Sequence, residues 1–247
     1  MMQRVLALVK MELLKLIREP AILFLNLLFP AILTLVFGLA FGGIGGGDSA
    51  MFDMMAPGLF AYACIFLVMT VAMSFTEDRE SGLLKRINVT PTTSSQFIGS
   101  HIITNMVIAV IQLVIVFLFS LLMGFRPNVD VFGVVMAFIF MLLLSLCSVG
   151  LGLITASISK SSGAAVGLSF IFILPQMFFG TFIQPTEVTQ GIAAFLPSYY
   201  VTKAITTIFN GVSPFAVEIL MYLGIIALMS ILIVILGIFL FKKFGKK

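Results

Sequence analysis

Residues 75–91 read FTEDRESGLLKRINVTP, and this stretch decides the fold because it is the long charged island between apolar runs. Its acidic residues come first and its basic residues last, which is the order that the helix dipole favours. The pattern predicts a short helix over 76–91, and Thr90-Pro91 should end it because a residue before proline disfavours helix. The ionised residues are Glu77, Asp78, Arg79, Glu80, Lys85 and Arg86.

One carboxylate of this predicted helix is badly placed for a helix at a membrane. On a helical wheel Leu83, Leu84 and Ile87 share one face, and Glu80 falls among them. Such a carboxylate is costly unless a cation or a hydrogen-bond donor pairs with it. The alternative interpretation is a solvated loop, and the charges alone do not separate the two.

The composition is that of an integral membrane protein. Of 247 residues, 61% are hydrophobic and only 10% are charged, whereas roughly a quarter are charged in soluble domains. The mean hydropathy is +1.22. We therefore expect an all-α membrane protein with one domain, 1–247. Cys64 and Cys147 lie inside apolar runs without metal-ligand spacing, which predicts small buried side chains.

Six apolar runs are long enough to cross the hydrocarbon layer, which takes roughly 20 helical residues. The first run exceeds the roughly 7–15 apolar residues of a signal peptide and no clear cleavage site follows, so we expect it to be retained. Pro30 and Pro175 predict kinks, and Thr93 and Gln96 have capping-box spacing. The predicted spans are 21–41, 55–75, 97–123, 131–157, 164–183 and 218–241.

Residues 4–19 precede the first span and predict an amphipathic helix that lies in the membrane interface. Glu19-Pro20 should break this helix before the first span begins. The apolar face contains Val5, Leu6, Val9, Leu13, Leu16 and Ile17, and the other face contains Arg4, Met11, Lys15 and Arg18.

The basic residues set the expected orientation. With six spans, 12 Lys and Arg residues lie on one side of the membrane, and only Arg126 and Lys203 lie on the other. The positive-inside rule therefore places both termini and the loop 76–96 in the cytoplasm. The net charge of +4 and the pI near 9.2 are explained by basic residues that orient the protein in the membrane, so we expect no nucleic-acid partner.

The segment 184–217 follows the fifth span and is apolar but interrupted by glycine and proline. Each apolar piece is too short to span, so we expect two short re-entrant helices that dip into the outer leaflet or cap the bundle. An exposed external loop is the alternative.

Several chemistries have no motif in the sequence. No G-x-x-x-x-G-K-[ST] stretch occurs, so we expect no P-loop ATP site in this chain. The one histidine, His101, lies early in the third span, where a polar interface residue is the simpler interpretation than a catalytic base. No metal motif is present, and we expect no metal site, no cofactor and no enzymatic activity in this chain. The spans hold almost no ionisable group for ion-coupled transport, so any transport energy must come from elsewhere.

Three stretches in order resemble the permease subunit of a type-2 ATP-binding-cassette (ABC) exporter, and the likeness covers nearly the whole chain. The first is MELLKLIREPAILFLNLLFPAILTLVFGLAFG at 11–42. The second is Asp78-Arg79-Glu80-Ser81-Gly82 followed by Lys85-Arg86 and Pro91, with Asp78 where the family has Glu. The third, a weaker match, is Leu196-Pro197-Ser198-Tyr199-Tyr200, with Leu196 where Asn is common.

The resemblance implies a mechanism. The loop after span 2 would be a coupling helix that docks on a separate ABC ATPase subunit, which holds ATP and Mg²⁺. Glu80 would pair with Lys15 or Arg18 of the N-terminal helix. A second permease copy or a paralogue would complete the transporter within membrane lipid. The residues implied in ATPase coupling are Glu77, Arg79, Glu80, Gly82, Lys85 and Arg86.

The resemblance also places a substrate path between two permeases along spans 1, 2 and 5. Polar and adaptable apolar side chains in these spans are the candidates for its wall: Asn26, Thr34, Phe66, Met69, Gln176 and Phe179. The abundant Phe and Met suit an apolar or amphiphilic cargo, although lipid-facing surfaces want the same residues. A membrane scaffold that recruits a cytoplasmic partner without transport is the rival hypothesis, and a passive channel lacks any selectivity ring.

Overall fold

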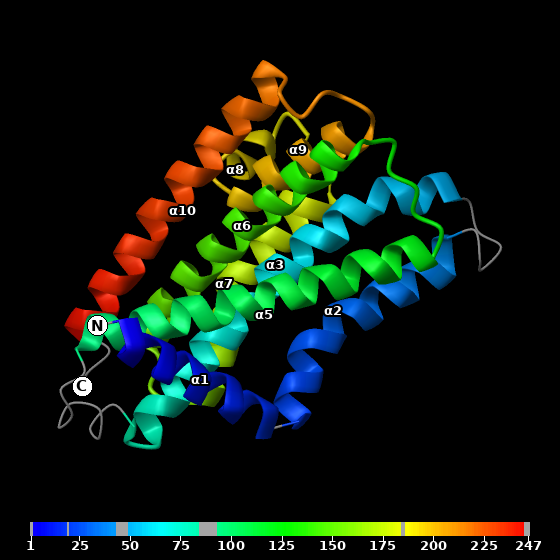
Figure 1. The fold of residues 1–247 in the computed structure, drawn as a ribbon. Coiled ribbons are helices and arrows are strands. Elements are labelled where there is room, and N and C mark those ends of the chain that lie inside the picture. The colour runs from blue at the N-terminus through cyan, green and yellow to red at the C-terminus, as the bar shows by residue number, and fades with distance from the viewer. Residues whose placement is uncertain (1, 19, 43–48, 84–92, 184–185, 245–247) are drawn as a thin grey trace.

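Helices are the regular secondary structure in the part of the chain that the structure describes. The computed structural model describes residues 2–18, 20–42, 49–83, 93–183 and 186–244, and these contain no strand, as the all-α prediction requires. Figure 1 shows a bundle of long helices, with a short helix lying across one end and two short helices at the other. In chain order the elements are α1 (Met2–Arg18), α2 (Pro20–Phe41), α3 (Ser49–Glu80), α5 (Ser94–Leu122), α6 (Val131–Ile158), α7 (Ser162–Met177), the π-helical segment η2 (Phe178–Phe182), α8 (Gln190–Ala193), α9 (Pro197–Phe209) and α10 (Val217–Phe244).

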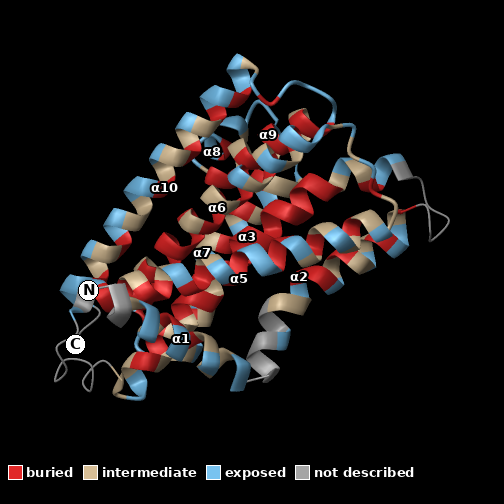
Figure 2. Ribbon diagram, in the orientation of Figure 1, coloured by how far each residue is buried: buried red, intermediate tan, exposed pale blue. Residues whose placement is uncertain are grey.

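α3 is the central helix of the bundle. Of its most apolar stretch 83% is buried, against 17% for α10. It packs against α2, α5, α6, α7 and α9, and Phe52, Phe60 and Phe75 are fully buried along its length. Figure 2 shows the buried residues concentrated on α3, with exposed residues along the outer side of α10. The rest of the bundle is therefore assembled around α3.

Five helices are long and apolar enough to cross a membrane, judged by length and composition. The first predicted span, 21–41, forms α2, but its apolar described part, Leu27–Phe41, is shorter than these five. The five candidates are Ala50–Glu80, Ser95–Leu122, Val131–Ile158, Ser162–Phe182 and Val217–Phe244. They coincide with the second to sixth predicted runs, so the chain is a multi-pass membrane protein.

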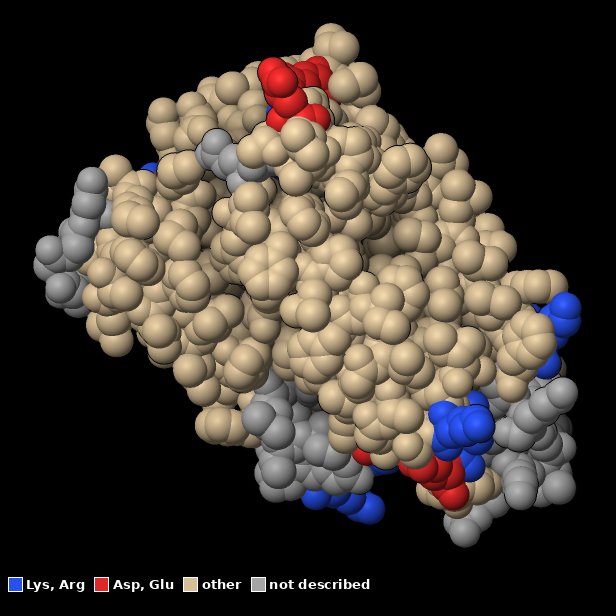
Figure 3. Space-filling model, turned by 180° about the vertical axis from the view of Figure 1, so that it is seen from behind, with Lys and Arg blue, Asp and Glu red and all other residues tan. Residues whose placement is uncertain are grey.

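The molecular surface agrees with a membrane setting. In Figure 3 charged side chains gather towards the edges of the view, and uncharged surface covers the broad middle. Large apolar side chains are exposed along α10, among them Leu228 (60%) and Ile235 (59%). Such a continuous exposed apolar surface is unfavourable in water and favourable against lipid.

α6 and α10 cross in close contact through glycines. A Cβ atom at Gly237 would lie 2.6 Å from the Gly150 carbonyl oxygen, and a Cβ atom at Gly150 would lie 2.9 Å from the Val234 backbone nitrogen. Only glycine allows the two backbones to approach this closely. α10 is therefore fixed to α6 by a shared seam.

The start of α5 and the prolines inside α2 and α7 can be compared with local signals in the sequence. Thr93 Oγ1 accepts from the Gln96 N–H at 3.3 Å, and Gln96 Oε1 accepts from the Thr93 N–H at 3.0 Å, so the predicted capping box is confirmed. Pro30 lies inside α2, which changes direction along its length in Figure 1. Pro175 lies inside α7, which passes into the wider turn of η2 at Phe178.

Two short helices, α8 and α9, lie within the segment 184–217, where the sequence predicted re-entrant helices. α9 packs on α6 and α10, and the Asn128 N–H donates to the Phe209 carbonyl at 3.0 Å, which joins the end of α9 to the connection between α5 and α6. These helices therefore cap the end of the bundle opposite α1. Insertion into a leaflet remains a prediction.

Candidate functional site

The amphipathic helix α1 packs on α5 and α2, and it has a buried side and an exposed side. Glu12 (5% exposed) and Val9 (8%) face the bundle, whereas Leu6 (60%) and Ile17 (64%) are exposed. The predicted apolar face of 4–19 is therefore divided, with one edge buried and the other free for lipid. The inward side of α1 also contains a carboxylate, which a simple interfacial helix would not need.

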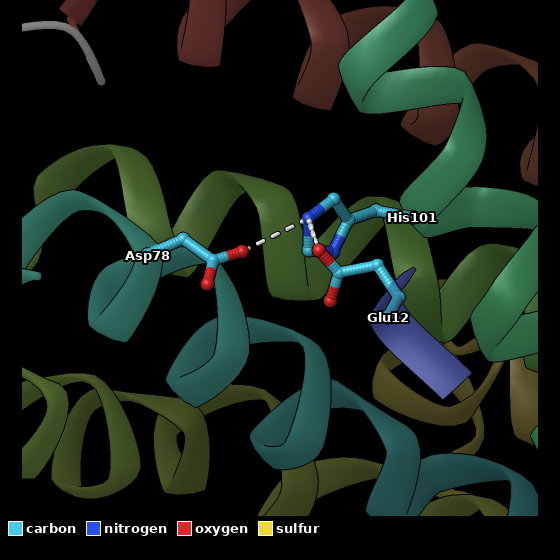
Figure 4. Close-up of side chains that lie close together, drawn as sticks. All are labelled: Glu12, Asp78 and His101. Carbon is cyan, nitrogen blue, oxygen red and sulfur yellow. Dashed lines mark ion pairs between the residues drawn. The ribbon is translucent and has the colours of Figure 1, made fainter. Parts of the chain in front are cut away.

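Glu12 reaches a buried histidine at the junction of three helices. His101 on α5 is 1% exposed, and its Nε2 lies 3.2 Å from Glu12 Oε1 on α1 and 3.0 Å from Asp78 Oδ2 on α3. Figure 4 shows the two carboxylates approaching the same ring nitrogen from different sides. His101 therefore lies at the centre of a buried charged cluster, which the prediction of a polar interface residue did not include.

Lys15 completes this cluster from α1. Its ammonium group donates to Asp78 Oδ1 at 2.9 Å and lies 3.9 Å from Glu77 Oε2. Partial burial lowers the pKa of Lys15, but the hydrogen bond to Asp78 and the nearby carboxylates outweigh it, so this pKa lies above its ordinary value of 10.5. Lys15 therefore stays charged and supplies the cation that the buried carboxylate of Asp78 requires.

Aromatic rings enclose the histidine. The rings of Phe75 and Phe97 lie 4.2 Å and 4.5 Å from the His101 ring, measured between centroids. Both phenylalanines are fully buried, and Phe241 from α10 packs edge-on against Phe75. The rings shield one side of the imidazole from water, which strengthens the attraction between the charges beside it and makes any unpaired charge there expensive.

The next residues of α3 contact the opposite side of the bundle. Arg79 donates to the Ala156 carbonyl at 3.3 Å and to the Ser159 carbonyl, both at the end of α6. Glu80 Oε2 accepts from the Ser162 N–H at 3.2 Å, at the start of α7. A cation at a helix C-terminus and an anion at a helix N-terminus are both favourable for the helix dipoles. The end of α3 therefore holds α6 and α7 together.

The predicted partner of Glu80 is wrong. Lys15 pairs with Asp78 and Glu77, while Glu80 is exposed and bonds Ser162, and Arg18 is exposed on α1. The reason is the phase of α3, which turns Asp78 towards α1 and Glu80 away from it. α1 and the end of α3 are tied together as expected, but by Asp78.

The structure corrects the start of the predicted helix over 76–91. Residues 76–80 are the last turn of α3, which ends at Glu80, and the Gly82 N–H bonds the Arg79 carbonyl at 3.1 Å. Gly82 has a φ of 72°, a left-handed conformation that glycine adopts without strain. Lys85 and Arg86, with the rest of 84–92, lie outside the described residues.

A pocket of about 910 Å³ opens between α1 and the end of α3. Basic and acidic side chains line it from both helices, together with apolar ones. Its charged lining residues are Lys10, Lys15, Arg18, Glu77, Asp78 and Glu80. Two of the residues predicted to couple to a partner, Glu77 and Glu80, thus lie around one pocket, together with Lys15 and Arg18 of the N-terminal helix.

The predicted path residues lie on α2, α3, α7 and η2. Thr34 and Gln176 are buried and donate to carbonyls of their own helices, those of Pro30 and Phe172. Met69 and Phe179 are half-buried, and the side chain of Asn26 lies outside the described residues. These positions are therefore distributed over four different elements.

A row of aromatic rings, which we call the aromatic row, links three of these elements. Phe66 stacks on Phe29 of α2 at 5.1 Å and contacts Tyr62, which in turn approaches Phe182 of η2 at 6.2 Å. Phe182 stacks on Phe37 of α2 at 6.1 Å. Of these rings only Phe66 was a sequence candidate, because single-residue hydropathy cannot distinguish a ring that faces another helix from one that faces lipid.

The sequence interpretation also missed Glu12 and undervalued Asp78. One available signal was the inward face of α3, on which Val71, Phe75 and Asp78 recur at helical spacing and are all buried. Glu12 gave a second signal, since it stands one turn before Lys15 on the same helix. No local pattern showed that these two helices meet at His101.

Comparison with known proteins gives the family of the chain. No curated protein matches the sequence. The sequence model of the ABC-2 type transporter matches residues 3–210, which run from the start of α1 to the end of α9. Because this match covers most of the 247 residues and includes the charged junction, the chain belongs to the ABC-2 type transporter family.

Proposed function

We propose that this ABC transporter permease exports a hydrophobic or amphiphilic substrate from the cytoplasm or the inner leaflet, driven by ATP hydrolysis in a separate ATPase subunit. ATP and Mg²⁺ would bind that subunit and not this chain. Two permeases, identical or paralogous, would face each other in the inner or plasma membrane. Each would have six spans, including α2, and both termini in the cytoplasm.

The observation that carries the proposal is the double attachment at the end of α3. Asp78 holds α1 and α5 through Lys15 and His101, while Arg79 and Glu80 hold the end of α6 and the start of α7. A partner that displaces this one point acts on five helices at once. That is the property required where an ATPase transmits a conformational change to the membrane part.

The pocket between α1 and α3 supplies a docking position for that partner. It is lined by Lys10, Lys15 and Arg18 as well as by Glu77 and Glu80, so a helix or loop with both charge signs would find complements there. The apolar side chains of Met11 and Leu14 add a surface that a partner would bury. The predicted contacts of Lys85 and Arg86 belong to the same proposal.

The aromatic row supports the apolar nature of the cargo. Its rings lie between α2, α3 and η2, which correspond to the first, second and fifth predicted spans. Aromatic side chains accept a range of apolar shapes through dispersion and ring contacts. Export of a small inorganic ion is not supported by such a surface.

The test is reconstitution of the chain with a candidate ABC ATPase in lipid vesicles. We expect a stable complex whose ATP hydrolysis is stimulated by amphiphilic cargo, and we expect Arg79→Ala and Glu80→Ala to lower this stimulation while the complex still forms. Arg126→Ala is the matched control. Arg126 also donates to backbone carbonyls, those of Leu121 and Phe125, but it lies at the C-terminal end of α5, away from the charged junction.

Two results would overturn the proposal. If no ABC ATPase binds the chain, the scaffold hypothesis becomes the better account of the charged junction. If cargo stimulates ATP hydrolysis as strongly in Arg79→Ala and Glu80→Ala as in Arg126→Ala, the end of α3 has no part in coupling. Transport assayed in vesicles of known orientation decides between export and import.

A further inference from the structure

We propose that Glu12, Asp78 and His101 form a binding site for a divalent transition-metal cation of the Zn²⁺ type at the junction of α1, α3 and α5. Among the described residues these three offer ligand atoms that all lie within 4.8 Å of one another. The inference does not depend on transport, because it concerns only how three helices are joined.

The spacing of the ligand atoms matches a coordination shell. Nε2 of His101 lies 3.0 Å from Asp78 Oδ2 and 3.2 Å from Glu12 Oε1. Ligands about 2.1 Å from a Zn²⁺ ion, at the angles of a tetrahedral or octahedral shell, are about 3.0 to 3.4 Å apart. One imidazole and two carboxylates are also a donor set that divalent first-row metals accept.

Without a metal ion the same three atoms lie at ion-pair distances but lack well-formed hydrogen bonds. Glu12 Oε1, Asp78 Oδ2 and His101 Nε2 are buried, and none makes a well-formed hydrogen bond among the described residues. A single Nε2–H can point at one carboxylate oxygen but not at two in different directions, as Figure 4 shows. Lys15 occupies the other oxygen of Asp78, Oδ1, and so leaves Oδ2 free for the ion.

A second observation independently points to a ligand at this place. A cavity of about 40 Å³ is lined by Glu12 and His101 and also by Thr104 and Asn105 from the next turn of α5. Thr104 Oγ1 and Asn105 Oδ1 are buried and have no hydrogen-bond partner among the described residues. These residues are 4% and 3% exposed. The cavity has room for a water molecule, and these oxygens would hold a metal-bound water in place.

The charges of the cluster agree with this assignment. Glu12, Asp78 and Glu77 contribute three carboxylates near one another, and Lys15 contributes one cation. With neutral His101, one divalent ion would balance the remaining two negative charges. A closed shell of this kind would make the contact of α1 with α3 and α5 depend on the metal.

The experiment uses the full chain, purified in detergent with a histidine-free tag, treated with a chelator and then titrated with Zn²⁺. We expect about one Zn²⁺ per chain, a higher melting temperature with Zn²⁺, and no displacement by excess Mg²⁺, which prefers an all-oxygen shell. Glu12→Gln and Asp78→Asn keep the side-chain shape and should weaken binding by at least about tenfold. Glu187→Gln, an exposed glutamate far from the junction in sequence, is the matched control and should bind as the wild type does.

X-ray absorption at the zinc edge on the wild-type protein needs no variant and therefore stands even if Asp78→Asn fails to fold. We expect nitrogen and oxygen ligands at about 2.0–2.1 Å with outer-shell scattering from one imidazole. The site is overturned if the wild type retains no Zn²⁺ after dialysis, if the spectrum lacks imidazole scattering, or if Glu12→Gln and Asp78→Asn bind as tightly as Glu187→Gln.

Discussion

Lys15 and Asp78 lie 63 residues apart in the sequence, and the 2.9 Å hydrogen bond between Lys15 Nζ and Asp78 Oδ1 fastens α1 to the end of α3. The carboxylate is 1% exposed and the lysine side chain 34% exposed, so the pair is buried on one side and reaches solvent on the other. If α1 moved away from α3, this pair would break and the protein would lose stability.

The first prediction concerns that pair. Lys15→Met keeps the length of the side chain but removes its charge, which leaves the Asp78 carboxylate buried with one fewer partner. We expect the free energy of unfolding to fall by about 1–3 kcal/mol, less than for a fully buried pair because the lysine is partly screened by solvent. Thermal unfolding followed by circular dichroism measures this. Lys10→Met, an exposed lysine of the same helix, should change stability by no more than about 0.5 kcal/mol.

The second prediction concerns pH. The pKa of Lys15 in the folded protein lies above 10.5, so its contribution to stability is complete below pH 10.5 and is lost as pH rises through the higher folded value. The stability difference between wild type and Lys15→Met should therefore be constant from pH 7 to 10 and shrink above pH 10.5. Denaturation at a series of pH values tests this, and a difference that shrinks between pH 7 and 9 would assign the effect to another group.

The third prediction concerns the connection between α6 and α7. Arg79→Ala removes the donor to the Ala156 and Ser159 carbonyls, so the amides around Ser162 should exchange hydrogen faster while those of α10 do not. Arg79→Lys restores the charge but not the two-pronged geometry, and it should protect the loop only in part. Hydrogen exchange read by mass spectrometry separates the three proteins. Equal exchange in all of them would mean that the loop is held by other contacts.

The fourth prediction compares two glycines of α10. A Cβ atom at Gly237 would meet the Gly150 carbonyl oxygen at 2.6 Å, so Gly237→Ala should push α10 away from α6 and cost about 1–3 kcal/mol. A Cβ atom at Gly224 would have no atom within 4 Å, and Gly224→Ala should stabilise the helix by about 0.5–1 kcal/mol. Thermal unfolding of both variants in the same lipid tests this prediction. If Gly237→Ala were as stable as Gly224→Ala, α6 and α10 would be able to separate enough to accommodate the added methyl group at little cost.

The helices were predictable because their signals are local. The apolar runs fix where α3, α5, α6, α7 and α10 lie, since each must cover the thickness of a membrane. The Thr93 and Gln96 pair fixes the start of α5, because its two hydrogen bonds involve residues three apart. In both cases the sequence neighbourhood contains all the interacting groups.

The charged junction was not predictable in the same way. Treating 76–91 as a helix of its own separated Asp78 from Val71 and Phe75, although all three lie on one buried face of α3. The partners of Asp78 come from α1 and α5, and their meeting depends on tertiary packing, which no spacing in the sequence records. Glu12 was missed for the same reason.

The length of α3 has a mechanical consequence. Its 32 residues form one helix that rises about 1.5 Å per residue, so it is about 48 Å long and extends from the charged end to the buried Phe52 near its start. A tilt of about 5° around its middle would swing each tip by about 2 Å in opposite directions. A displacement of α1 that tilted α3 in this way would therefore move the opposite end of α3 by a comparable distance.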